Sequence, residues 1–283
     1  MTSLIGDAPV DGVDVAALLG IPISAEQERA VQAPLKPCAV IAGAGTGKTT
    51  VMAARVVWLV ASRLVSPEEI LGLTFTNKAT AELSERIESN LTRVGLLTSE
   101  QPRPTVATYD SFAGTLVNDY GAWDGISTGA HLITGARAYQ LAAEVVMGLD
   151  KAPLAATHMG PTFIAQAVVK LAGAMASHDA SPGKVRRADA RWRQMLLAAP
   201  TKRGGDRYAD IDKWLSRVDE REELLDLVAA YQNLKKERGL VEFGDRMVQA
   251  LHLVTHHPRV GEELRARYRV VLLDEYQDTS SAQ

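Results

Sequence analysis

The sequence predicts an α/β fold in which a parallel sheet is interrupted by an all-helical insertion. Three observations lead to this prediction. Between residues 24 and 120, segments with helical patterning alternate with short apolar runs, as in a parallel sheet covered by helices. Strand signals vanish from about 122 to 220, where helical stretches are separated by breaks rich in Gly, Pro and His. An apolar run without alternation returns at 268–275 and suits the centre of a parallel sheet.

The composition is that of a soluble globular chain without covalent cross-links. The length of 283 residues suggests two domains, and 46% of the residues are hydrophobic. Cys38 is the only cysteine, which excludes an internal disulfide and fits a reducing, cytoplasmic location. We find no signal peptide and no apolar run long enough to cross a membrane. These features exclude a secreted disulfide scaffold and a membrane-spanning protein.

The first α/β part follows a leader at 1–22 that we expect to be loose. A helix is predicted over 24–34, because Ser24 as N-cap and Gln27 at the third helical position form a capping box. Residues 38–42 (CAVIA) predict a buried strand. The remaining predicted elements are a buried helix at 48–62, a capping signal at 66–69, strands at 70–75 and 104–108, and helices at 77–90 and 111–121.

The rest of the chain predicts helices and one returning strand. Helices are predicted at 135–149, 163–177 and 221–239, the last with an apolar stripe that ends before Gly239. The strand at 268–275 brings the chain back to the sheet. The predicted domains are the leader at 1–22, the first part of the α/β domain at 23–121, the helical insertion at 122–221, and the second part of the α/β domain at 222–283.

A basic segment stands out within the insertion. Residues 181–208 carry eight Lys or Arg against two Asp, a local charge of +6 in a chain whose net charge is −3. Trp192 lies among these cations. Such a segment can bind phosphates, and the alternative is a solvated surface or a mobile loop.

A glycine-rich loop at 42–50 (AGAGTGKTT) fits the phosphate-binding pattern, with Ala42 in place of the first glycine. Lys48 can reach the β- and γ-phosphates of ATP, and Thr49 can hold Mg²⁺. The alternative is a chance glycine-rich turn. Backbone N–H groups of such a loop turn inward around phosphate oxygens, so the residues predicted to hold the nucleotide here are Ala44, Gly45, Thr46, Gly47, Lys48, Thr49 and Thr50.

Two carboxylates follow the last apolar run. Asp274 is predicted to hold Mg²⁺ and Glu275 to act as the general base for the attacking water. A surface turn is the alternative for such a pair, but the glycine-rich loop in the same chain favours the catalytic interpretation. The predicted cofactors are therefore ATP and Mg²⁺.

Six stretches in order resemble the motifs of the superfamily I DNA helicases of the UvrD/Rep/PcrA group, in which alanine at the first position of the phosphate loop is usual. The resemblance covers residues 24–120 and 225–283. The sequences of two of these stretches, AGAGTGKT and VVLLDEYQDTS, also resemble those of the motor subunit of actinobacterial AdnAB-type helicase–nucleases. The six stretches are ISAEQERAV, AGAGTGKT, LTFTNKATAELSERI, VATYDSFAGTL, ERGLVEFGDRM and VVLLDEYQDTS.

The resemblance implies a RecA-like domain carrying a helical insertion, and 3′-to-5′ translocation on single-stranded DNA driven by ATP and Mg²⁺. The implied partners are single-stranded DNA and duplex junctions, a second motor domain that this chain lacks, and a second helicase–nuclease subunit. We accordingly expect the chain to be an N-terminal half-motor, truncated after Gln283, that does not unwind DNA alone.

The resemblance also implies individual roles. Gln27 would bind the adenine edge, and its alternative is the capping box with Ser24. Gln277 would act with the catalytic residues and couple the nucleotide state to the DNA-binding side. The alternatives for two of the DNA-binding residues are that the phenylalanine belongs to the core and that the asparagine is a helix N-cap. The residues implied to bind DNA are Phe75, Thr76, Asn77 and Thr108.

The sequence departs from the family at two positions. Many relatives have histidine at Asp110, which is better suited to cap a helix beginning at Ser111 than to contact DNA. Where this chain has Thr50, many relatives have an arginine that packs against the adenine. We therefore expect this chain to hold the adenine more loosely, or with another residue. Two competing functions are a regulatory P-loop ATPase without unwinding activity and an inactive, structural motor domain.

Overall fold

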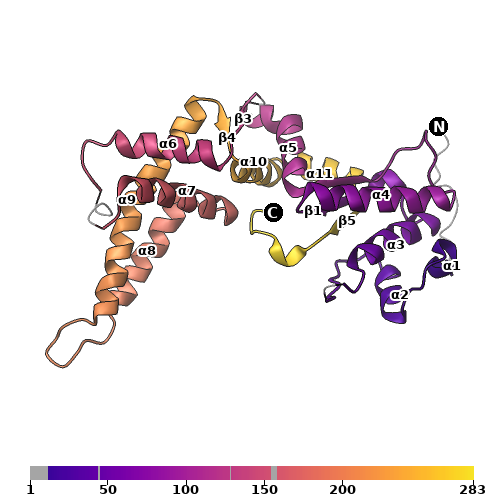
Figure 1. The fold of residues 1–283 in the computed structure, drawn as a ribbon, viewed down its shortest axis with the longest axis horizontal. Coiled ribbons are helices and arrows are strands. Elements are labelled where there is room, and N and C mark those ends of the chain that lie inside the picture. Colours follow the sequence, from indigo (N-terminus) through magenta and orange to yellow (C-terminus); the bar gives the residue numbers. More distant parts are fainter. Residues whose placement is uncertain (1–11, 44, 128, 154–157) are drawn as a thin grey trace. The chain divides into compact units, whose positions relative to one another are not determined.

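The computed structural model describes residues 12–43, 45–127, 129–153 and 158–283. The chain divides into two compact units, Met1–Phe112 with Val254–Thr279, and Ala113–Leu253 with Ser280–Gln283. Two helices, α5 (Tyr109–Tyr120) and α10 (Phe243–His256), contribute residues to both units (Figure 1). None of the described helices is long and apolar enough to cross a membrane.

Unit 1 is built on a parallel sheet of three strands, β1 (Ile70–Thr74), β2 (Thr105–Thr108) and β5 (Val270–Leu273), in the order β2–β1–β5. The strands predicted at 70–75 and 104–108 are confirmed. Because β1 pairs with both neighbours, Leu73 lies opposite Leu273, from the far end of the chain. The carboxyl ends of parallel strands meet at one edge, so the residues after β1 and β5 are neighbours.

The strand predicted at 268–275 is confirmed as β5, but the expectation that it occupies the centre of the sheet is wrong. It pairs with β1 alone among the described residues, and it therefore forms an edge of the sheet. Its burial alternates, with Val271 49% and Leu273 41% exposed. An apolar sequence predicts that a strand can be buried. The position of that strand in the sheet depends instead on which other strands pair with it.

The core of unit 1 lies between α3 (Lys48–Ala61) and α4 (Asn77–Arg93), whose buried faces pack together. The helix predicted over 48–62 is confirmed, and so are the capping boxes at Ser24 and Ser66. The predicted leader is not loose throughout. Its residues 1–11 lie outside the described chain, but α1 (Val15–Leu19) buries both of its end residues in this core. The remaining helices are α2 (Ala25–Val31), η1 (Pro67–Glu69), α11 (Pro258–Arg267) and η4 (Tyr276–Asp278).

The buried strand predicted at 38–42 is wrong. These residues form neither helix nor strand, and Val40 is 52% and Ile41 98% exposed. A β-strand is stable when its backbone groups pair with a neighbour. No described strand pairs with this segment, so its apolar sequence alone does not make it a strand.

Unit 2 is mainly helical. A shared core joins α6 (Gly135–Met147), α7 (Pro161–Ser177) and α9 (Ala209–Glu237), with Leu141, Val168 and Tyr231 almost completely buried. The helix predicted at 221–239 is α9, which begins earlier, at Ala209, and pairs along its first half with α8 (Pro182–Leu197). A pair of two-residue parallel strands, β3 (His131–Leu132) and β4 (Leu240–Val241), was not predicted. The other helices that the structure describes in this unit are η2 (Gly121–Asp124), α6, α7, α8 and α9.

Candidate nucleotide and DNA site

The glycine-rich loop leads directly into the N-terminus of α3. Gly47 is the N-cap of α3 with φ 82°, and Gly45 has φ 75°, backbone conformations that side-chain-bearing residues rarely adopt. The Thr46 hydroxyl donates to the Gly43 carbonyl over 2.8 Å. Predicted residue Ala44 lies outside the described chain. The loop and the first turn of α3 together offer backbone N–H groups and a helix dipole to an anion.

Gln27 connects α2 to this loop, and the alternative that it forms a capping box with Ser24 is confirmed. Its Oε1 accepts from the Ser24 N–H over 2.9 Å and the Ser24 hydroxyl accepts from the Gln27 N–H over 3.2 Å, which completes the capping box. Its Nε2 donates to the Thr46 carbonyl over 3.0 Å. The capping box therefore positions the amide beside the phosphate loop.

Lys48 and Glu275, 227 residues apart, form an ion pair that brings the two predicted motifs together. Lys48 Nζ lies 3.2 Å from Glu275 Oε1 and 3.4 Å from Oε2. Gln277 also donates to Glu275. The hydrogen bond from Gln277 and the contact with Lys48 lower the pKa of Glu275, so its carboxylate is the stable form. Glu275 has φ 48°, an uncommon backbone conformation for such a residue and a feature found at functional sites.

Asp274 begins the turn after β5. Its N–H donates to the Leu73 carbonyl over 2.9 Å, which continues the pairing with β1. Burial and then the neighbouring Glu275 charge raise the pKa of Asp274. The described residues contain no cluster of three or more His, Cys, Asp or Glu side chains that could hold a metal. A carboxylate and the hydroxyl of half-buried Thr49 are nevertheless the hard oxygen donors that Mg²⁺ takes beside phosphate oxygens, so the residues fit this ion.

Sequence reasoning missed one residue at the phosphate loop. Arg86, in α4, donates from Nη1 to the Thr50 hydroxyl over 2.8 Å. Thr50 lies beside Gly47, as does Gln27, because a Cβ on Gly47 would stand 3.4 Å from Gln27 Nε2 and 3.8 Å from the Thr50 Cβ. The sequence signal was weak, because Arg86 is an ordinary exposed cation next to the buried position Ile87 in a helical pattern.

The predicted DNA residues at the end of β1 are exposed. Phe75 is 37% exposed, so the alternative that it belongs to the core is wrong, and its ring lies 5.0 Å from that of Tyr109. The Thr76 hydroxyl accepts from the Ala79 N–H over 3.1 Å and caps α4. Asn77 is the first residue of that helix, so the alternative that it is the N-cap is also wrong.

Thr108 and Asp110 differ from expectation. The Thr108 hydroxyl accepts from the Ser111 N–H over 3.0 Å, and Thr108 is 9% exposed, so the helix start uses a group that was predicted to contact DNA. Helix α5 begins at Tyr109 and includes Asp110, so the prediction that Asp110 is its N-cap is wrong. Threonine and aspartate both cap helices, and the sequence pattern could not decide between two positions two residues apart.

Tyr109 lies between the residues predicted to bind DNA and those predicted to bind the nucleotide and Mg²⁺. Burial, followed by the charges of Asp274 and Tyr276, raises the pKa of Tyr109 to about 12. Its hydroxyl is buried and has no hydrogen-bond partner among the described residues, and its ring packs against Phe75. One side chain therefore contacts a predicted DNA residue and lies within the electrostatic reach of a predicted Mg²⁺ ligand.

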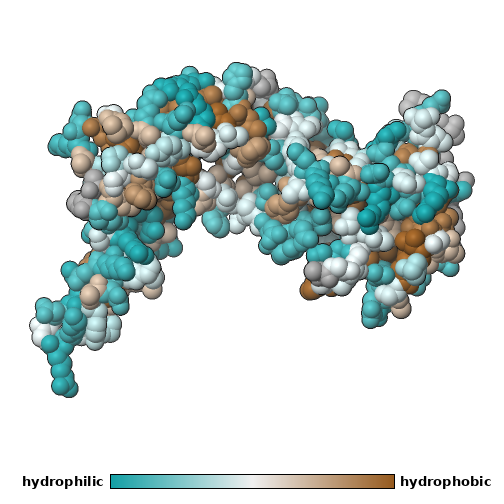
Figure 2. Space-filling model, viewed as in Figure 1, coloured by the Kyte–Doolittle hydropathy of each residue, from teal (hydrophilic) through white to brown (hydrophobic). Residues whose placement is uncertain are grey.

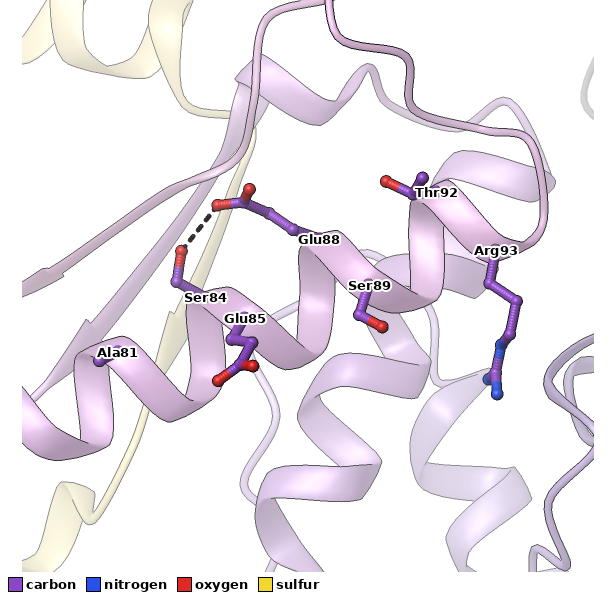
Figure 3. Close-up of a pocket in the computed structure, with 7 residues that line it drawn as sticks. All are labelled: Ala81, Ser84, Glu85, Glu88, Ser89, Thr92 and Arg93. Carbon is purple, nitrogen blue, oxygen red and sulfur yellow. Dashed lines mark hydrogen bonds between the residues drawn. The ribbon is translucent and has the colours of Figure 1, made fainter.

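A shallow hollow lies on the outer face of α4 and is lined by none of the described residues predicted to bind nucleotide or DNA (Figure 3). Glu88 in this hollow accepts from the Ser84 hydroxyl over 3.0 Å and pairs with Arg103. These contacts account for its charged group, and we assign the hollow no role. Its lining residues are Ala81, Ser84, Glu85, Glu88, Ser89, Thr92 and Arg93.

Comparison with known families identifies a match over most of the chain. Residues 23–283 match the model of the UvrD/REP helicase N-terminal domain. This match includes both the phosphate loop and the acidic pair, which the structure brings into contact.

Three curated proteins illustrate the similarity. DNA helicase II of Rickettsia typhi is 26% identical over 92% of this chain and 34% of its own length. The ATP-dependent DNA helicase UvrD1 of Mycobacterium leprae is 27% identical over 92% of this chain and 29% of its own length. DNA helicase II of Haemophilus influenzae is 28% identical over 96% and 32%, respectively. The chain thus spans about a third of the length of the relatives it matches.

Proposed function

The chain belongs to the UvrD/REP helicase family through its N-terminal domain, and we propose that it is the ATP- and DNA-binding part of a 3′-to-5′ DNA helicase. The observation that carries this proposal is the contact between Lys48 and Glu275. It joins the phosphate loop to the acidic pair, as hydrolysis of a nucleotide requires. We further propose a RecA-like fold for the α/β part, with residues 122–221 as its helical insertion, and a cytoplasmic location.

The nucleotide would be held at the start of α3. Backbone N–H groups from Gly45 to Lys48 would surround the phosphates, and the Lys48 ammonium would bind the β- and γ-phosphate oxygens. Gln27 already lies beside the loop, and its amide is placed to reach the edge of the base. An amide can both donate and accept, which suits selection of adenine.

Hydrolysis would require two changes at the acidic pair. A triphosphate carries more negative charge than one carboxylate, so Lys48 would leave Glu275 for the phosphate. Glu275, held by Gln277, would then accept a proton from the attacking water. Thr49 and Asp274 would hold Mg²⁺, which would supply charge neutralisation at the phosphates.

Single-stranded DNA would lie against the end of β1. Phe75 would stack on a base, and Thr76 and Asn77 would contact the backbone. Duplex junctions, a second motor domain and a second helicase–nuclease subunit are the other partners that we propose for the whole protein.

Replacing Glu275 tests the exchange of Lys48 between carboxylate and phosphate. In Glu275→Gln the lysine has no anionic competitor, so we expect MgATP to bind as tightly as in the wild type or tighter. The side chains of Lys48 and Glu275 are 33% and 38% exposed, and an ion pair this exposed to solvent is weak, so any gain in affinity for MgATP is expected to be small. Titration of the chain with a fluorescent ATP analogue measures this, and weaker binding by Glu275→Gln would contradict the proposal.

Arg86 is our candidate for the group that replaces the arginine missing at position 50. A guanidinium stacks on an aromatic face, so we expect Arg86→Ala to weaken ATP binding by about 1 kcal/mol, roughly fivefold. Inorganic triphosphate, which has no base, should bind both proteins equally. Competition against a fluorescent ATP analogue gives both affinities.

Two further variants control this experiment. Arg93→Ala, on the same helix, should bind ATP like the wild type, because Arg93 donates to Asn90 instead of the phosphate loop. Adding Thr50→Arg to Arg86→Ala should restore ATP binding by supplying a guanidinium from α3. An equal loss of ATP and triphosphate binding would instead make Arg86 a phosphate ligand and contradict the proposed base contact.

A further inference from the structure

The basic segment of unit 2 forms most of a helical hairpin, in which α8 and the first half of α9 lie side by side and are joined by residues 198–208 (Figure 1). No third layer of described residues covers the distal part of this hairpin. On α9, the large core cluster of unit 2 begins at Leu224, whereas in the first half of the helix Leu215 and Val218 are buried outside that cluster. The distal hairpin is therefore open to solvent on most sides.

The hairpin separates its cations into two groups. The first group faces α9 and is neutralised there. Arg186 pairs with Glu222 and Asp226 at 2.6 Å each, and Arg193 pairs with Asp219. These cations hold the two helices together, so the local charge of the sequence overstates what the surface offers to a ligand.

The second group is exposed and has no acidic partner among the described residues. Arg187 and Arg191 are four residues apart and share one face of α8, which differs from the face that meets α9. Exposed cations also lie on the connecting loop and at the start of α9. Residues 187–217 carry eight Lys or Arg and four Asp, a net charge of +4 within a chain of net charge −3. The second group comprises Arg187, Arg191, Lys202, Arg203, Lys213 and Arg217.

Aromatic rings lie among these cations. Trp192 and Trp214 are 41% and 45% exposed, and their ring centroids are 6.5 Å apart at 88°. The Arg217 guanidinium lies 5.0 Å from the Trp214 ring. Tyr208, 49% exposed, has Lys202 5.7 Å from its ring. Figure 2 shows paler and brown residues scattered along the largely hydrophilic visible face of this hairpin.

We infer that the distal α8–α9 hairpin is a binding surface for single-stranded DNA, with Trp192 and Trp214 as base-stacking side chains and Arg187 and Arg191 as phosphate contacts. A positive surface attracts a polyanion, and exposed aromatic rings beside cations are the combination that binds bases together with their backbone. Duplex bases are already stacked on one another and cannot use the rings, which favours a single strand.

This inference rests on the proposed function, because it adds a second contact for the DNA that Phe75 is proposed to bind. Its test uses fluorescence anisotropy of a labelled oligodeoxythymidine and of a labelled duplex of equal length, titrated with the 283-residue chain. We expect Trp192→Ala/Trp214→Ala to bind the single strand about tenfold more weakly and the duplex unchanged. The fluorescence of these tryptophans in the wild type should be quenched by the single strand but not by the duplex.

A second, independent test changes the cations. The double variant Arg187→Gln/Arg191→Gln loses two phosphate contacts, so the magnitude of its slope of log affinity against log salt for the single strand should fall by about 1.4. Arg186→Gln is the matched control, since Arg186 is held in ion pairs with α9 and should leave both the affinity and the slope unchanged. Thermal unfolding of each variant establishes that the hairpin is folded.

The outcomes separate the inference from the proposed function. If the wild type binds single-stranded DNA and both hairpin variants bind it equally well, the hairpin inference is overturned and the function stands. Equal losses for single strand and duplex overturn the assignment to a single strand. If the wild type binds no DNA at low salt, the proposed function itself fails.

Discussion

Lys48→Ala is expected to lose nearly all affinity of the chain for MgATP. The Lys48 ammonium lies 3.2 Å from Glu275 Oε1, and Lys48 is the first residue of α3, where the phosphates are proposed to bind. Removing one partner of a close charge pair costs about 2–5 kcal/mol, which corresponds to a loss of roughly thirtyfold or more. A titration with a fluorescent ATP analogue in the presence of Mg²⁺ measures this loss.

A matched lysine controls for charge and position. Lys78 lies in the first turn of α4, as Lys48 lies in the first turn of α3, and it pairs with Glu82 one helical turn away. Lys78→Ala should bind MgATP like the wild type. Both variants should unfold close to the wild-type temperature, because each lysine is at least one-third exposed. Undiminished ATP binding by Lys48→Ala would remove the basis for assigning the loop to nucleotide binding.

Lys235→Ala is expected to destabilise unit 2 by about 3 kcal/mol or more. Lys235 is 2% exposed, and its ammonium donates to Glu242 over 2.6 Å and to Asp245 over 2.7 Å. Tyr231 donates to the same Glu242 carboxylate over 2.7 Å, and burial together with this hydrogen bond raises the pKa of Tyr231. Without the ammonium, two partly buried carboxylates would face each other, and an uncompensated buried charge typically costs 3–5 kcal/mol.

The neighbouring Lys236 provides the control. It is exposed on the same helix, and Lys236→Ala should change the free energy of unfolding by no more than about 0.5 kcal/mol. Urea denaturation followed by tryptophan fluorescence reports mainly on unit 2, since Trp123, Trp192 and Trp214 lie there and only Trp58 lies in unit 1. Equal unfolding midpoints for the two variants would show that the buried network does not stabilise the fold.

Local features of the fold could be predicted from the sequence because nearby residues determine them. The capping box of Ser24 and Gln27 is one example, since both partners lie within one helical turn. The phosphate loop is another, because its glycines adopt left-handed conformations that few other residues tolerate. The apolar sequence of residues 48–62 likewise predicted a buried helix, and α3 confirms it.

Features that depend on distant partners could not be predicted in this way. Whether residues 38–42 form a strand depends on a neighbour, and the apolar pattern does not contain one. The approach of Arg86 to Thr50 joins two helices and has no local signature. The charge of the basic segment was visible, but only the packing of α8 against α9 shows that Arg186 is neutralised whereas Arg187 is not paired with an acid in the described chain.

Nucleotide and DNA are both proposed to bind at adjacent strand ends of one sheet. Leu73 and Leu273 are paired, so Phe75 and Glu275 follow neighbouring strands, and Tyr109 lies against Phe75 near Asp274. Binding at two sites that share a rigid edge and a common side chain should be coupled, typically by about 1–3 kcal/mol.

The coupling is measured as the affinity of the wild-type chain for labelled oligodeoxythymidine, with and without saturating MgATP. We expect binding in both conditions and a change in affinity of at least about fivefold on adding MgATP. Identical affinities in the two conditions, or no binding of the oligonucleotide at low salt, would contradict this expectation.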